Sequence, residues 1–142
     1  MRIDVPLGPE RFEVGALDHT TDQRLWRFNA PHAGYTVEVL VAGSDRGPDP
    51  AWLDLAARVA ANLGPLEAVA RYYLRAFVDE GKLDGPGEWA LDWLEFGRHP
   101  DDMPEPFELV LVHEGDTYGG WGVRFFRGPQ GWRPWEFRRF QR

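Results

Sequence analysis

Two consecutive segments of helical periodicity interrupt a chain whose other apolar stretches favour strands. The first helix is expected to follow Asp49, a typical N-cap, with Pro50 at its first position, and to stop at Gly64. The second is expected over residues 65–79, with Glu67 on the side away from its buried face. The Gly-Pro corner between the two predicts an antiparallel or steeply angled helix pair.

The stretches on both sides of these helices have the composition and alternation of strands. Residues 88–96 fit either a short helix or a strand, and their tryptophans favour the strand. The stretches 10–16, 24–28 and 35–41 are expected to form two or three antiparallel strands, and further strands are expected at 107–113, 121–126 and 134–140. The sequence therefore predicts an α+β fold, in which an antiparallel sheet of about five to six strands carries a two-helix layer on one face, in the order strands, helix, helix, strands.

Length and composition set further limits. With 142 residues, 43% of them hydrophobic, the chain is expected to form a single domain over residues 1–142. It has no cysteine, which excludes disulfides, thiol catalysis and Cys-ligated zinc. It shows neither a signal-peptide pattern nor an apolar run of membrane-spanning length, so a cytoplasmic protein is expected.

Charge is unevenly distributed along the chain. The formal net charge of −7 argues against affinity for nucleic acids or anionic membranes, which need basic surfaces. Residues 1–118 sum to −12 and residues 119–142 to +5. Residues 79–116 alone hold twelve acidic side chains, so an acidic stretch runs directly into a basic one.

The C-terminal residues predict a hairpin whose register can be worked out from the side chains. A turn at 128–132 pairs Phe125 with Trp135, Val123 with Phe137, Arg124 with Glu136 and Gly122 with Arg138. This register places Trp135 and Phe137 in the core and leaves Trp121, Trp132 and the tail from Arg139 exposed. The glycines flanking Trp121 suggest a bulge or an aromatic ring lying over the backbone.

The basic and aromatic residues of this hairpin have two interpretations. They could form a platform for bases or phosphate, because aromatic rings stack and guanidinium groups match phosphate oxygens. They could instead pair with the acidic stretch at 79–116 within the same sheet. The acidic total favours the second interpretation.

Catalytic and metal-binding patterns are weak. His113, Glu114 and Asp116 could surround a cation at a strand end, but a turn in which Asp116 caps its own backbone is favoured. The histidines lack metal-ligand spacing, no serine lies in a nucleophile elbow, and the glycines match neither phosphate-binding nor dinucleotide motifs. The sequence therefore predicts no metal site and no cofactor.

Paired carboxylates are the one catalytic class that the sequence leaves open. Asp101, Asp102 and Glu105 share the segment 98–106 with His99, and glycosidase or phosphodiesterase chemistry uses carboxylates held close together. Three prolines in the same segment favour an exposed loop with solvated acids. Taken together, these patterns favour a protein that is not an enzyme.

The segment 53–126 resembles small bacterial domains of unknown function. The resemblance rests on LGPLEAVARYYL, on Leu91 to Leu94, on Phe107-Glu108-Leu109, on Gly115-Asp116 and on Trp121-Gly122. Some such domains are similar to immunity proteins encoded beside polymorphic toxins, which occlude a toxin by surface complementarity. The resemblance implies no catalytic residue, and this chain departs from it in its proline-rich 98–106 segment and its Arg-rich tail.

These observations predict a non-enzymatic cytosolic protein, monomeric or homodimeric, that binds and neutralises a basic partner. Tryptophans 89, 93 and 121 are candidate anchors. Two alternatives remain: a small-molecule-binding or hydrolytic domain with a Trp-lined cleft, and a self-associating structural module. The candidate partner-binding residues are Asp101, Asp102, Glu105, Asp116, Trp121, Trp132 and Arg139.

Overall fold

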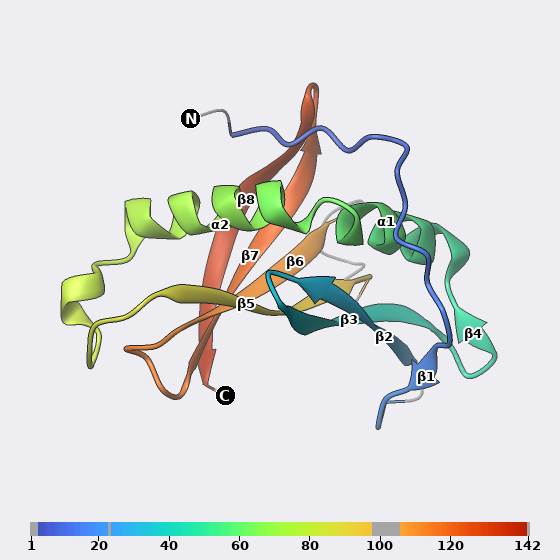
Figure 1. The fold of residues 1–142 in the computed structure, drawn as a ribbon, viewed down its shortest axis with the longest axis horizontal. Helices are drawn as coiled ribbons and strands as arrows, with labels where there is room; N and C mark the ends of the chain where they lie inside the picture. Colours follow the sequence, from blue (N-terminus) through green and yellow to red (C-terminus); the bar gives the residue numbers. More distant parts are fainter. Residues whose placement is uncertain (1–2, 23, 98–105, 142) are drawn as a thin grey trace.

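The computed structural model describes residues 3–22, 24–97 and 106–141. These residues form two α-helices and a large mixed sheet (Figure 1). In chain order the elements are β1 (Asp18–His19), β2 (Leu25–His32), β3 (Tyr35–Ser44), β4 (Gly47–Pro48), α1 (Pro50–Ala60), α2 (Leu63–Phe77), the 3-10 helix η1 (Glu80–Lys82), β5 (Trp89–Phe96), β6 (Phe107–His113), β7 (Gly119–Gly128) and β8 (Gly131–Gln141). The predicted α+β class is confirmed.

The sheet differs from the prediction in size and in one pairing. Within the described ranges it has eight strands in the order β1-β2-β3-β5-β6-β7-β8, with β4 paired to β3, where about five to six were expected. The β3–β5 pair is parallel, whereas every other pair is antiparallel. A parallel pair needs a long crossover connection, and the chain from β4 through both helices supplies it.

The start of α1 agrees with the prediction, but the boundary between the helices does not. Asp49 Oδ1 accepts hydrogen bonds from the backbone N–H of Ala51 (2.9 Å) and Trp52 (3.2 Å), and Pro50 takes the first position. The expected stop at Gly64 is wrong, because α1 already ends at Ala60 and Gly64 lies in the first turn of α2. Pro65 also fits there, since the N–H groups of a first turn have no helical partner.

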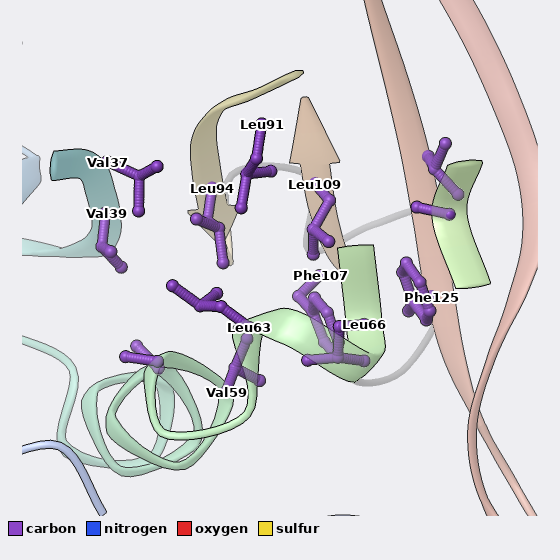
Figure 2. Close-up of a cluster of buried hydrophobic side chains, with 14 of the residues drawn as sticks. Val37, Val39, Val59, Leu63, Leu66, Leu91, Leu94, Phe107, Leu109 and Phe125 are labelled. Atoms are coloured by element: carbon purple, nitrogen blue, oxygen red, sulfur yellow. The ribbon is translucent and has the colours of Figure 1, made fainter. Parts of the chain in front are cut away.

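Both helices cover one face of the sheet, and the core lies between them (Figure 1). In Figure 2, Val59 and Leu66 of the helices point toward apolar side chains of β3, β5, β6 and β7. The labelled sheet residues are Val37, Val39, Leu91, Leu94, Phe107, Leu109 and Phe125, each at most 2% exposed. Alternate residues of each strand enter this layer, which explains the period-two pattern of the sequence.

The structure corrects two predictions, one about the N-terminal segment 10–16 and one about Glu67 of α2. The segment 10–16 forms no strand in the structure and instead lies over α1, where Phe12 N–H donates to the Ala57 carbonyl (2.9 Å). Glu67, expected to point away from the buried face, accepts a hydrogen bond from the N–H of Leu91 (3.1 Å) and contacts His32 Nε2 (2.8 Å). The pairing of β3 with β5 begins only at Trp93, so it does not include Leu91. Glu67 therefore supplies the acceptor for the Leu91 N–H.

The predicted C-terminal hairpin forms, with one local change in register. Val123 pairs with Phe137, Arg124 with Glu136 and Gly122 with Arg138, as predicted. Phe125 faces Pro134, because a bulge leaves Trp135 without a direct partner. The expectation that Trp135 is core is therefore wrong, and its exposed fraction is 61%. Phe140 lies over Gly120, where an added Cβ would come within 2.7 Å of the ring.

In the part of the chain that the structure describes, no helix combines the length and apolar character needed to cross a membrane.

Candidate interaction cleft

An open cleft of about 600 Å³ lies between the end of α2, the segment around η1 and the β7–β8 pair. Apolar side chains from three parts of the chain line it together with charged ones. The lining residues are Phe77, Val78, Asp79, Lys82, Leu83, Asp84, Asp116, Trp121, Phe137 and Arg139. The cleft therefore joins positions that are about sixty residues apart in the sequence.

The apolar part of the cleft is a cluster of aromatic rings. Trp121 and Phe137 have ring centroids 6.0 Å apart, and Phe77 lies 5.8 Å from Phe137. Trp121 is 7% exposed, whereas Phe77 is 62% exposed at the last turn of α2. An aromatic ring that is held in place but open to solvent is the kind of residue that anchors protein interfaces.

Asp116 is a buried carboxylate beside this cluster. Arg139 donates to both of its oxygens, from Nη2 to Oδ1 (2.8 Å) and from Nε to Oδ2 (3.0 Å). Trp121 Nε1–H donates to Oδ2 (3.0 Å). Gly119 is required at the end of the same turn, because an added Cβ would overlap the Asp116 carboxylate. These bonds fix the indole and the guanidinium relative to each other.

Two exposed acids, Asp79 and Asp84, form the acidic rim of the cleft. Among the described residues neither forms an ion pair, although Asp79 Oδ1 accepts a hydrogen bond from the N–H of Gly81 (3.0 Å). The pKa of Arg139 is raised, first by its hydrogen bond to Asp116 and also by the charge of Asp84. Since Arg139 and Asp116 neutralise each other, the accessible negative charge of the cleft lies on the acidic rim, opposed by Lys82.

Glu80 anchors the segment that carries the acidic rim. Its Oε1 accepts a hydrogen bond from Trp89 Nε1–H (2.6 Å) and is 3.4 Å from Arg75 Nε. The bond from Trp89 lowers the pKa of Glu80 below its usual value, and Arg75 adds to this effect. Trp89 is 2% exposed, so it is not available as the surface anchor that the sequence suggested.

The structure brings together three of the residues predicted from the sequence: Asp116, Trp121 and Arg139. Trp132 lies apart from them near the other end of β8, where it is 3% exposed and packs 4.9 Å from Phe107. The expectation that Trp121 and Trp132 are exposed is wrong, because both rings belong to the aromatic core. Asp101, Asp102 and Glu105 lie outside the described residues.

The turn at 113–116 contains the residues for which a cation site and a capped turn were weighed. The N–H of Gly115 donates to His113 Nδ1 (2.9 Å), and the N–H of Asp116 donates to the His113 carbonyl (2.9 Å). The Asp116 side chain was expected to cap this turn, and its oxygens accept hydrogen bonds from Arg139 and Trp121. Over the described ranges, no group of three or more potential ligand side chains could hold a metal ion.

Three arginines of the hairpin, Arg124, Arg138 and Arg139, contact carboxylates of the acidic stretch, as the second interpretation predicted. Arg138 donates to both oxygens of Glu108 (3.0 and 2.8 Å), and Arg124 lies 3.8 Å from the same carboxylate and 3.1 Å from Glu136. Glu108 is only 3% exposed. These groups stabilise the face of the sheet opposite the helices.

Sequence reasoning missed Phe77, Asp79 and Asp84 as cleft residues. Phe77 continues the apolar stripe of α2 and was assigned to the core, but it lies in the last turn of α2, where it is 62% exposed. The two aspartates belong to the acidic stretch that begins at residue 79.

Comparison of the chain with protein-family models, with curated proteins and with solved structures finds no match. The resemblance to small bacterial domains and immunity proteins therefore stays a prediction.

Proposed function

We propose that this chain is a non-enzymatic protein-binding domain whose cleft receives a basic side chain of a partner protein. The observation that carries the proposal is that the exposed Phe77 ring and the acidic rim line the same open cleft. An arginine or lysine has a matching structure, with an apolar stem and a cationic end. Its stem would cover Phe77 and Phe137, and its charge would meet Asp79 and Asp84.

The charge of the whole chain supports such a partner. A net charge of −7 attracts a cationic protein from a distance and raises the association rate at low salt. Asp101, Asp102 and Glu105 belong to the same acidic stretch as the acidic rim and are proposed to add to this attraction. In this proposal the chain neutralises a basic partner in the cytoplasm, in the manner of an immunity protein.

The test removes the charge of the acidic rim while keeping its shape. Asp79→Asn/Asp84→Asn removes two negative charges, and asparagine at 79 still caps the N–H of Gly81. Glu13→Gln/Asp18→Asn is the matched control, because it removes two exposed charges away from the cleft. Each tagged protein is used to capture partners from the native cell, followed by quantitative mass spectrometry.

A basic protein captured by the wild type and by the control, but reduced at least tenfold with the cleft variant, is the expected result. Circular dichroism must show the same folded spectrum for all three proteins. If every captured protein is retained equally by the cleft variant, the cleft is not the binding site and the proposal fails.

The same cleft favours a second candidate function, the binding of a small molecule. Its volume of about 600 Å³ lies within the range of ligand sites, and Trp121 lies beside carboxylates there. A hydrolytic version would depend on Asp79 and Asp84, because Asp116 is already bound by Arg139 and Trp121. Native mass spectrometry of the purified protein would show a retained ligand that is lost in Asp79→Asn/Asp84→Asn.

A further inference from the structure

β8 is the long edge strand of the sheet (Figure 1). It has eleven residues and stands at one end of the strand order, whereas β1 at the other end has only two. An edge strand carries N–H and C=O groups that can pair with another chain, and proteins commonly shorten or cover such edges. Because β1 is short, the edge of β8 is the one that offers a template for a further strand.

The chain itself covers the first half of this edge. Val5 forms an antiparallel bridge with Trp132 through two backbone hydrogen bonds (2.7 and 2.9 Å). Pro134 has no N–H to offer, and the Trp135 carbonyl accepts a hydrogen bond from the Tyr73 hydroxyl (2.8 Å). The Val5 bridge therefore shows that an extended segment fits against the edge of β8 in antiparallel orientation.

Farther along β8, the direction of the backbone groups follows from the register. The N–H and the carbonyl of Trp132 point away from β7, because both are bonded to Val5. In an antiparallel pair, residues of this kind alternate with residues that are bonded across the pair. The extra residue of the bulge lies on β8 and not on β7. Val123 and Trp121 are therefore in phase with Arg127, the β7 partner of Trp132, and none of the three is bonded to β8.

The segment 137–141 of β8 is the free edge. Phe137 pairs with Val123 and Arg139 with Trp121, so both direct their N–H and C=O groups away from β7, and Gln141 has the same phase. Among the described residues, nothing forms a hydrogen bond with these outward backbone groups. The side chains of Phe137 and Arg139 line the cleft. The free edge and the cleft therefore meet at the same two residues.

A strand added at the free edge would extend one wall of the cleft. Residues directly opposite each other in an antiparallel pair place their side chains on the same face, about 4.5–5.5 Å apart. The residues opposite Phe137 and Arg139 would therefore stand beside the cleft that Asp79 and Asp84 also line. Arg139 donates to both oxygens of Asp116 (2.8 and 3.0 Å), so its charge is compensated and leaves room for a basic neighbour.

We propose that the basic partner binds through an extended segment that pairs antiparallel with the free edge and places basic side chains of alternate residues at the cleft. The inference rests on the proposed function, because the acidic rim is what selects the basic side chains. In such a complex, the backbone hydrogen bonds supply affinity, and the pockets for alternate side chains supply specificity. The cleft alone would accept a basic side chain from any structure, whereas the free edge accepts only an extended segment.

The test titrates the full chain with the acetylated and amidated peptide Thr-Arg-Val-Arg-Val-Arg-Thr. Antiparallel pairing directs its arginine side chains to the cleft and its arginine N–H groups to β8. In ¹⁵N NMR, the peptide is expected to protect the amides of Phe137 and Arg139 from exchange with solvent. The amide of Arg138 is the internal control, because it faces β7 and is protected with and without the peptide. The absence of any shift at millimolar peptide would overturn the proposal.

N-methylation of the peptide separates backbone pairing from charge. Methyl groups on the three arginine nitrogens keep every side chain and charge but remove the donors to β8, so binding should weaken at least about tenfold. Methyl groups on the two valine nitrogens, which point away from β8, are the matched control and should leave binding unchanged. On the chain, Gln141→Pro removes one outward N–H and should weaken binding, whereas Gln141→Ala keeps it and should not.

The outcomes distinguish this inference from the proposed function. If both methylated peptides bind alike, or if only valine methylation weakens binding, the antiparallel pairing is wrong. The proposed function still stands in that case, provided that Asp79→Asn/Asp84→Asn weakens binding of the unmodified peptide. If arginine methylation weakens binding but this variant does not, the pairing stands and the proposed function fails. A dimer of the chain alone, with the amides of Phe137 and Arg139 already protected, would assign the free edge to a second copy and overturn the inference.

Discussion

Replacing Asp116 by alanine tests whether the cleft is built around a buried carboxylate. The Asp116 side chain is 7% exposed and accepts three hydrogen bonds, two from Arg139 and one from Trp121. Its removal leaves the indole N–H of a buried tryptophan without an acceptor. Arg139 is affected less, because its side chain is 41% exposed and water can solvate the guanidinium group.

The expected loss of stability follows from these two terms. An unsatisfied buried donor costs about 1–3 kcal/mol. The bond to the solvent-accessible arginine adds little, because water can take its place. The expected result is a decrease of about 1–3 kcal/mol in the free energy of unfolding, which for a domain of this size lowers Tm by roughly 3–10 °C.

Urea unfolding monitored by tryptophan fluorescence measures this difference directly. Asp116→Asn keeps an acceptor for the indole and should lose only about 1 kcal/mol. Glu114→Ala removes an exposed neighbouring acid and should change stability by less than about 0.5 kcal/mol. If Asp116→Ala is as stable as Glu114→Ala, the hydrogen bonds from Arg139 and Trp121 to Asp116 do not stabilise the fold.

Three further predictions concern the core, the opposite sheet face and acid stability. Leu66→Ala should lower the free energy of unfolding by about 2–5 kcal/mol in urea melts, and Leu66→Met by less than about 1.5 kcal/mol, since Leu66 is fully buried. Gly122→Ala should cost about 1–3 kcal/mol in the same assay, because its Cβ would lie 2.5 Å from the buried Glu108 carboxylate. The lowered pKa of Glu80 stabilises the fold above the unfolded value near 4.5, and this stabilisation is lost as the pH falls through the folded value. Glu80→Gln should therefore flatten the decline of Tm below about pH 4.5.

Each of these predictions has a contrary result. A Leu66→Ala variant as stable as Leu66→Met would mean that α2 is not packed on the sheet as described. An unchanged stability of Gly122→Ala would mean that the Glu108 carboxylate is free to move. If Tm depends on pH in the same way in the wild type and in Glu80→Gln, the hydrogen bond from Trp89 does not lower the pKa of Glu80.

The parts of the fold that depend on neighbouring residues could be predicted from the sequence. The N-cap at Asp49 and the Arg124–Glu136 pair both follow from side chains that act on nearby backbone or on a partner across one turn. The parallel β3–β5 pair could not be predicted, because alternation reveals a buried face but not the direction of the neighbouring strand. The exposure of Trp135 depends on a bulge, which shifts the register by one residue.

The candidate site was predictable to a similar extent. Asp116, Trp121 and Arg139 were selected for their charge and aromatic character, and the β7–β8 pairing brings them together. Phe77 and the acidic rim come from the other side of the cleft, and only the packing of α2 against the sheet brings them there. Their proximity is a tertiary contact without a local sequence signal.

The most direct test of the proposed function is a ¹⁵N NMR titration of the chain with the basic partner that it captures. The indole N–H of Trp121 lies in the cleft, and that of Trp132 lies near the other end of β8, so the two report on separate sites in one spectrum. The proposal predicts that the Trp121 resonance shifts with the partner, that the Trp132 resonance stays in place, and that Asp79→Asn/Asp84→Asn weakens the effect at least tenfold. A partner that binds without moving the Trp121 resonance would contradict it.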